Sequence, residues 1–240
     1  MSPRSVVSLI VILRTAIFAA LLCTCGAVTS FAQDAAPDGN GDTTAPPTKS
    51  FFLARTGERV NAPRIGIIHY LEFFQIRKKW IYPDIGYVDF AHDNYREFFI
   101  GGGRTLYDGK FATWDQELLY VQATGPAARS AGYLQPWSMV RFRFAPKLTS
   151  ETVYFLYLPL NDTARFHQVI ERAKLEYALK KRWKVGAGYA GTKPVGGKWL
   201  NKPFLTTTIS TRAGAFEFWL QRIPGGEQVE ARYVLIHTSH

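Results

Sequence analysis

The sequence lacks the features that hold or anchor many secreted proteins. Of its 240 residues only two are cysteines, Cys23 and Cys25, and both lie in the apolar stretch at the N-terminus. No disulfide is therefore expected in the rest of the chain, which excludes a small disulfide-stapled fold. No run after residue 32 reaches the roughly 18 apolar residues of a spanning helix. The domain must then be stabilised by burial and by its backbone hydrogen bonds.

Motifs for metal binding and catalysis are also scarce. Five histidines are spread along the chain, and only His237 and His240 lie close together, at the C-terminal end. Because a metal site needs convergent ligands, we expect no metal and no cofactor. Ser239 stands beside these histidines, but a nucleophile and its base need fixed neighbouring positions, so we expect no catalysis there. The run Gly101–Gly103 lacks the Lys-Ser/Thr of a phosphate loop and is expected to bend a strand or admit a bulky neighbour from across the fold.

The N-terminal residues have the pattern of a secretory signal peptide. Arg4 and Arg14 precede or enter an apolar run at Thr15–Val28, and Ser30-Phe31-Ala32 offers small residues for cleavage. We predict a signal peptide over residues 1–32, a flexible linker rich in Pro, Gly, Asp and Thr over 33–50, and one domain over 51–240. The chain has a formal net charge of +10. After a secretory signal, anionic lipid is a better partner for it than nucleic acid.

The stretch Gln168–Gly191 gives the clearest secondary-structure signal. From Arg172 to Lys180 the residues alternate between charged and apolar, with Leu175, Tyr177 and Leu179 on the apolar side. A period of two is typical of a strand with one apolar and one polar face. The basic turn Lys180–Arg182 follows, and a second alternation begins at Val185. A helix is the alternative, because Phe166, Val169, Ile170, Ala173 and Tyr177 also fall at helical spacing.

Nine further segments resemble strands and are separated by turn residues, which makes eleven strands with the two described above. Strands of about ten residues are longer than most soluble strands and suit a tilted transmembrane barrel, in which short turns and long loops lie at opposite ends. The turn at Asp108-Gly109 is short, whereas loops at Ala123–Ala131 and Gly191–Lys202 are long. Eleven strands would be odd, and the alternation of turns places a further strand at Phe51–Val60. We predict an all-β, antiparallel up-and-down transmembrane β-barrel of about 12 strands, with 10 as the alternative. The segments are Arg64–Arg77, Trp80–Phe90, Arg96–Tyr107, Lys110–Gln122, Tyr133–Phe144, Thr152–Leu160, Gln168–Lys180, the strand from Val185, Phe204–Thr211, Ala215–Ile223 and Gln228–His237.

Three segments carry a resemblance to bacterial outer-membrane β-barrel proteins in general. They are LEYALKKRWKVGAGYAG, AFEFWLQRI and VEARYVLIH. The resemblance covers residues 51–240 in pattern and implies residence in the outer membrane, contact with its lipid and insertion by the outer-membrane assembly machinery. The chain departs from such barrels in ending on His240, with Tyr233 as the nearest substitute for a terminal aromatic residue.

The polar faces of the predicted strands carry a set of charges of both signs. We expect these side chains to line the interior of the barrel, and because charges buried together persist when paired, they favour a salt-bridged filling over an open anion pore. The set is Arg141, Arg143, Arg172, Lys174, Glu176, Glu217, Glu230 and Arg232, with Asp115 and Glu117 as possible members.

Three functions fit this sequence. The first is an outer-membrane barrel acting as a small channel or structural membrane component without catalysis. The second is an outer-membrane enzyme acting on lipid. The third is a secreted soluble barrel like the lipocalins, which would bind an apolar ligand and would reverse the faces. The first assignment places Leu175, Tyr177, Phe218 and Val140 against lipid.

Overall fold

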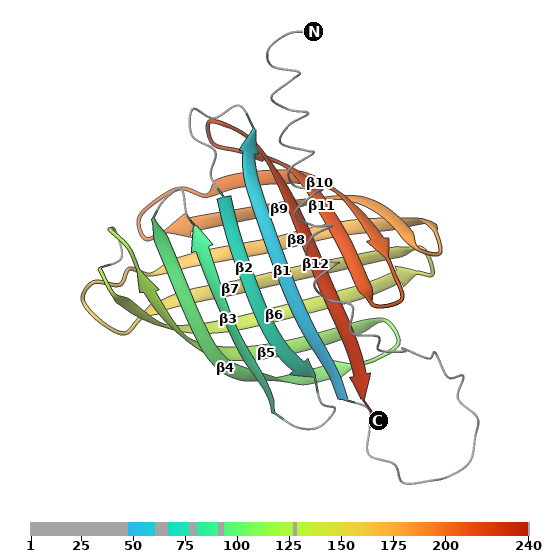
Figure 1. Ribbon diagram of the computed structural model, residues 1–240, viewed down its shortest axis with the longest axis horizontal. Helices are drawn as coiled ribbons and strands as arrows, with labels where there is room; N and C mark the ends of the chain where they lie inside the picture. Colours follow the sequence, from blue (N-terminus) through green and yellow to red (C-terminus); the bar gives the residue numbers. More distant parts are fainter. Residues whose placement is uncertain (1–47, 61–66, 77–80, 91–93, 127–128, 240) are drawn as a thin grey trace, which may run out of the picture.

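The chain forms a closed antiparallel barrel of twelve strands in the computed structural model, which describes residues 48–60, 67–76, 81–90, 94–126 and 129–239 (Figure 1). Each strand pairs with the next along the chain, and β1 pairs with β12 to close the sheet. The strands are β1 Thr48–Val60, β2 Ile67–Ile76, β3 Tyr82–Phe90, β4 Tyr95–Asp108, β5 Ala112–Thr124, β6 Ala131–Ala145, β7 Leu148–Pro159, β8 His167–Lys180, β9 Trp183–Pro194, β10 Leu200–Ser210, β11 Gly214–Ile223 and β12 Gly226–Ser239.

The prediction of twelve strands is confirmed. The strand expected at Phe51–Val60 is β1, and it begins at Thr48, within the segment predicted as linker. The long hairpin predicted after Gln168 is β8 and β9, so the helical alternative is wrong. The predicted signal peptide lies outside the described residues. None of the described residues forms a helix long and apolar enough to span a membrane.

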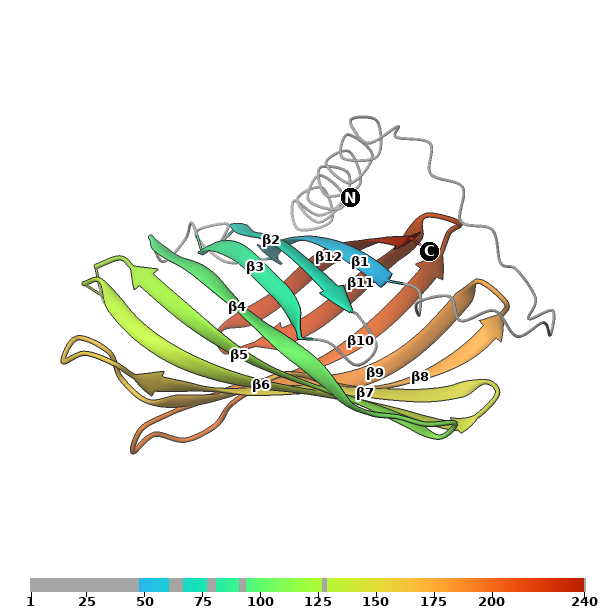
Figure 2. The ribbon, with the colours of Figure 1, turned by 90° about the horizontal axis from the view of Figure 1, so that it is seen from below.

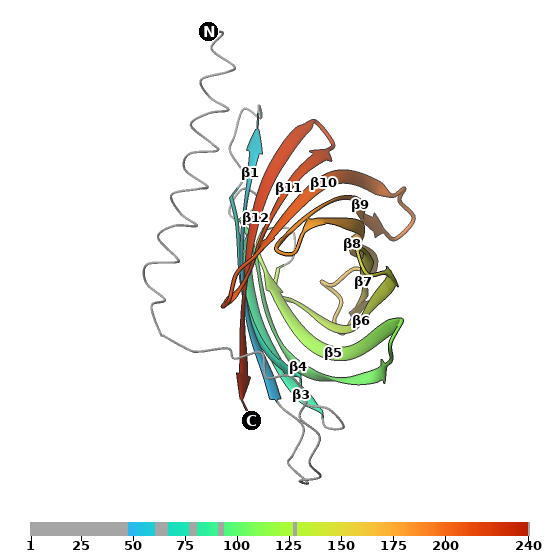
Figure 3. The same cartoon turned by 90° about the vertical axis from the view of Figure 1, so that its right-hand side faces the viewer.

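Closure of the barrel removes the sheet edges. Residues Thr48–Val60 of β1 pair in register with Glu227–Ser239 of β12 without a break. Strands β6–β9 at the back cross β1–β3 and β12 at the front at a steep angle (Figure 1), as tilted strands on opposite walls of a barrel do. The views in Figures 2 and 3 show the two walls enclosing an interior. The twelve described strands therefore leave no unpaired sheet edge for association with another chain.

The two faces of the sheet differ as the alternation predicted. Leu175 and Tyr177 on β8 are each 47% exposed, whereas Lys174 and Glu176 between them are each 7% exposed. Large apolar side chains are exposed along other strands as well, among them Phe98, Ile100, Leu118, Tyr120, Leu205 and Leu220. A monomeric soluble protein rarely exposes so extended an apolar surface. The exterior therefore fits a hydrocarbon environment.

The connections fall into two groups at opposite ends of the barrel. One end carries the short turns at 109–111, 146–147, 181–182 and 211–213. The other end, called the loop end below, carries the longer connections at 125–130, 160–166 and 195–199, together with one short turn at 224–225. The predicted alternation of turn lengths is thus present, with the 224–225 turn as its exception.

Glycines on β4 allow close contact with the neighbouring strands. A Cβ added to Gly103 would lie 2.8 Å from Cζ of Tyr82 on β3 and 2.3 Å from Cγ of Glu117 on β5. Tyr82 is fully buried and donates a hydrogen bond to Glu117 Oε1 at 2.9 Å. The bulky neighbour expected at this glycine run is therefore an adjacent strand's side chain, not one from across the barrel.

Candidate functional site

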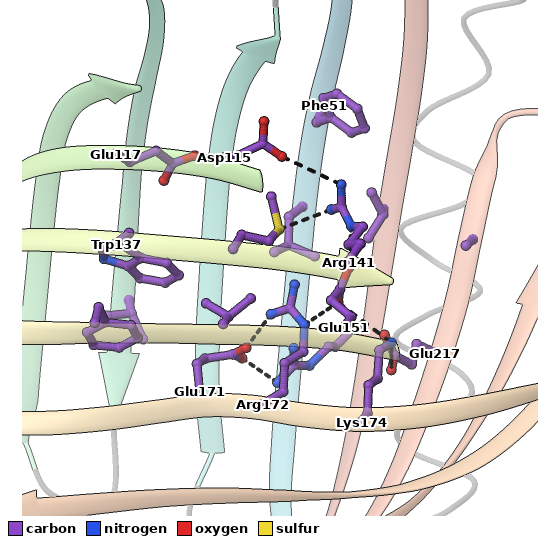
Figure 4. A pocket seen from close by; sticks show the side chains of 18 of the residues that line it. Phe51, Asp115, Glu117, Trp137, Arg141, Glu151, Glu171, Arg172, Lys174 and Glu217 are labelled. Atoms are coloured by element: carbon purple, nitrogen blue, oxygen red, sulfur yellow. Dashed lines mark hydrogen bonds and ion pairs between the residues drawn. The ribbon is translucent and has the colours of Figure 1, made fainter. Parts of the chain in front are cut away.

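A cavity of about 480 Å³ lies inside the barrel, and charged side chains from several strands meet in it (Figure 4). β8 contributes three of them, more than any other strand, because a β-bulge adds one charged residue to its inner face. Ile170 and Arg172 pair with successive residues of β7, which leaves Glu171 as an extra residue. A bulge breaks the strict alternation of a strand. Glu171 and Arg172 are adjacent in sequence and both line the cavity.

Glu151 on β7 is the centre of the charged cluster. Its Oε2 accepts a hydrogen bond from Nε of Arg141 on β6 at 2.6 Å, and its Oε1 accepts one from Nε of Arg172 on β8 at 2.5 Å. Lys174 Nζ lies 3.9 Å from the same Oε1. One carboxylate thus stands among three cations and joins β6, β7 and β8 across the cavity wall.

The cluster continues from β8 to β11 through Lys174. Its Nζ donates to Oε1 of Glu217 at 2.6 Å and lies 3.4 Å from Oε2 of Glu176. Glu217 also accepts a hydrogen bond from Thr206, and Glu176 accepts one from Thr208. Lys174 is 7% exposed, so its ammonium group is stabilised by these carboxylates in place of water.

Arg232 on β12 connects the cluster to the opposite wall. Its guanidinium donates to Glu171 at 2.6 Å and to Glu230 at 2.7 Å. It also stacks on the ring of Trp219, 3.5 Å from the ring centroid, which is a cation–π contact. Glu171 forms ion pairs with both Arg172 and Arg232. The bulge residue therefore links β8 directly to β12, and we call the whole set of ion pairs from Arg141 to Arg232 the charged belt.

The interior on the loop-end side of the charged belt is mainly apolar and aromatic, and its buried polar members are Gln135 and Glu97, the latter accepting hydrogen bonds from Tyr95 and Tyr157. On β6 the inward side chains change from Tyr133 and Trp137 to Arg141, and on β7 they change from Phe155 to Glu151. A buried cluster gathers here from β3 to the connection that follows β7: Val88, Phe99, Leu119, Val121, Ala123, Ala131, Tyr133, Val153, Phe155, Tyr157 and Ala164. The interior is thus divided along its axis into an aromatic part and a charged part.

Most of the predicted interior residues meet in the charged belt. Arg141, Arg172, Lys174, Glu217 and Arg232 line the cavity, and the buried Glu176 and Glu230 bind them. Asp115 and Glu117 also line the cavity, and Asp115 Oδ2 lies 3.9 Å from Arg141.

Arg143 does not belong to the charged belt. It is exposed and donates to the backbone carbonyls of Gly109 and Lys110 in the turn between β4 and β5. Pairing of β6 with β5 ends at Phe142, so Arg143 lies beside the turn between β4 and β5 in place of the interior.

Two central residues were missing from the predicted set. Glu151 was missed because the predicted strand began at Thr152, whereas β7 begins at Leu148. Glu171 was missed because strict alternation places it on the outer face, and only the bulge turns it inward. A glutamate among lipid-facing residues was the available signal for Glu171, since a charge on that face is costly.

No protein-family model and no curated protein matches the sequence. Solved structures do match the fold. The KdgM porin in complex with disordered oligogalacturonate is similar with a TM-score of 0.57 at 9% identity, covering 79% of this chain and 99% of that one. An outer-membrane channel from Pseudomonas putida F1 gives 0.55 at 7% identity, with 85% and 100% covered. The NanC porin gives 0.53 at 7% identity, with 79% and 100% covered. The chain therefore has the fold of outer-membrane channel barrels.

Proposed function

We propose that the protein is an outer-membrane channel for small solutes, and that the charged belt constricts its lumen. The observation that carries the proposal is a closed twelve-stranded barrel with an apolar exterior and an interior cavity crossed by ion pairs. An eight-stranded barrel is just filled by its own side chains, and larger barrels leave room for a solute. The protein acts by conduction and without catalysis in this proposal, with outer-membrane lipid as its partner.

The soluble ligand-binding barrel is the alternative that the exterior disfavours. It requires charged side chains on the outer face, whereas Leu175, Leu205 and Leu220 are exposed there and Lys174, Glu176 and Glu217 are buried. An outer surface of this kind would aggregate in water. A protein recovered from the soluble periplasm without detergent would contradict the channel.

Conductance across planar lipid bilayers tests the channel directly. We expect the purified, folded protein to insert and give small, discrete current steps. Replacing both Arg141 and Glu151 by alanine removes the ion pair on β6 and β7 and should enlarge the current steps. The matched control is Val140→Ala with Ser150→Ala, which changes the opposite face of the same two strands and should leave the current unchanged. A folded parent that gives no current in any salt would refute the proposal.

The solute class does not follow from the structural similarity. The KdgM porin is described with oligogalacturonate, an oligosaccharide that carries a carboxylate on each sugar. In this chain, by contrast, Arg172 and Arg232 are already bound by carboxylates, and a large part of the cavity wall is apolar. A wall of this kind offers little to a hydrophilic polyanion.

A further inference from the structure

The apolar part of the lumen is unusual for a membrane barrel, whose interior is generally polar. Trp137, Met139, Val153 and Phe155 line the cavity beside Phe99 from β4. Apolar side chains that face water inside a pore are less favourable than polar ones, because exposing apolar surface to water costs free energy. A surface with this chemistry suits a solute that is itself partly apolar.

The aromatic residues of this wall form an ordered surface. The rings of Trp137 and Phe155 are stacked, with centroids 4.1 Å apart and planes inclined by 13°. Tyr157 packs edge-on against Phe155 at 5.5 Å. The indole nitrogen of Trp137 donates to Oε1 of Gln135 at 2.5 Å, which fixes the ring. A flat ring entering the cavity would meet a surface held in place before it binds.

One cation at the edge of this surface is open to an incoming anion. The side chain of Arg141 is 38% exposed, compared with 15% for Arg172, 6% for Lys174 and 3% for Arg232. Its Nε donates to Glu151 and one terminal nitrogen lies 3.9 Å from Asp115 Oδ2, while the other has the sulfur of Met139, at 3.1 Å, as its partner among the described residues. A thioether is a weak acceptor, so this nitrogen can turn to a carboxylate oxygen with a net gain.

We propose that the lumen has a binding site for small aryl carboxylates, with the ring against Trp137 and Phe155 and the carboxylate at Arg141. A cavity of about 480 Å³ lies within the size range of small-molecule pockets, roughly 300–1,000 Å³, which are mainly apolar with a few placed polar groups. This inference rests on the proposed channel function and names its substrate class. The site would hold the solute on the loop-end side of the charged belt before it passes.

Binding to the protein in lipid nanodiscs tests the site, with heats measured by titration calorimetry and empty nanodiscs subtracted. Phenylacetate should bind saturably with one site per barrel. Glucuronate has the same charge and a ring of similar size but a hydrophilic surface, and it should bind at least tenfold more weakly. Benzyl alcohol keeps the aromatic ring without the charge and should also bind more weakly. Equal affinities for phenylacetate and glucuronate would overturn the proposal.

Two variants locate the bound molecule. Trp137→Ala should weaken phenylacetate binding about three- to tenfold, because one stacking partner is lost. The matched control is Trp114→Ala, since Trp114 on β5 is exposed on the outer face and should have no effect on binding. Arg141→Gln should weaken phenylacetate about tenfold and leave benzyl alcohol unchanged. Equal losses in the Trp137 and Trp114 variants, or no loss with Arg141→Gln, would place the ligand elsewhere.

The binding and conductance results separate this inference from the channel itself. Saturable binding that depends on Trp137 would support the binding site even if the protein gives no current. In that case only the proposed channel function would be refuted. The protein could also conduct potassium chloride and yet not bind phenylacetate in nanodiscs, with a current that phenylacetate does not reduce. That result would support the channel function and refute aryl carboxylates as its substrate class.

Discussion

Removing the charge of Glu151 is the most informative perturbation of the charged belt. In Glu151→Gln the side chain keeps its size, while Arg141, Arg172 and Lys174 lose the carboxylate they share. Breaking a buried ion pair by removing one partner costs roughly 3–5 kcal/mol. Arg141 is 38% exposed, so its part of the pair is screened by water and contributes little. The loss should therefore lie near the lower end, at about 3 kcal/mol.

Two measurements follow this substitution. Unfolding by urea in lipid vesicles should show a lower free energy of unfolding for Glu151→Gln. In planar bilayers under a salt gradient, the reversal potential should move toward anion selectivity, because the lumen loses one negative charge at the point where three cations meet. The control is Glu227→Gln, the same change at an exposed residue where β12 begins, which should alter neither quantity.

A double variant distinguishes the loss of the ion pairs from a general failure of the protein to fold. Adding Arg172→Gln to Glu151→Gln restores the balance of charge, so the selectivity should return toward that of the parent and part of the stability should be recovered. If Glu151→Gln matches the parent in both unfolding and reversal potential, the charged belt neither stabilises the barrel nor lies in the path of ions. The reasoning above would then be wrong.

Two other substitutions test the faces and the strand packing. Leu175→Arg should lower the free energy of unfolding in vesicles by roughly 2–4 kcal/mol, because it places a charge against lipid. Leu179→Arg lies nearer the strand end and should lower it less. Equal and negligible losses in both variants would contradict a lipid-facing position for Leu175. Gly103→Ala should destabilise the barrel by about 1–3 kcal/mol, because its Cβ would lie 2.3 Å from Glu117, whereas Gly132→Ala meets nothing closer than 3.7 Å and should be nearly neutral in the same unfolding assay.

The alternation of side chains made much of this fold predictable. Lipid selects apolar residues on one face of each strand, so a period of two is imposed wherever the other face is polar. β8, β11 and β12 have charged inner faces and were recognised close to their true limits, with Gln168–Lys180 predicted for His167–Lys180. The strand count followed from the turns, because each tight turn must return the chain to the opposite end.

The details of the candidate site were less accessible, because they depend on pairing between strands. A bulge is defined by the register of two strands, and the sequence of β8 alone does not reveal which residue is extra. The same holds for Glu151, whose importance comes from three cations supplied by β6 and β8. Single-strand patterns show which face a residue occupies but not which residues meet across the barrel.

The sequence contains a sign of the apolar wall, but it can be interpreted only once the fold is known. The segment Thr152–Leu160 is apolar on both faces, and in a soluble protein this pattern would indicate a strand buried on both sides. In a membrane barrel one face of the strand already meets lipid. Apolar residues on the second face, Val153, Phe155 and Tyr157, must then lie in the lumen, where they are buried against Phe99 and Val121. A two-sided apolar strand within an otherwise alternating barrel therefore points to an apolar site inside it.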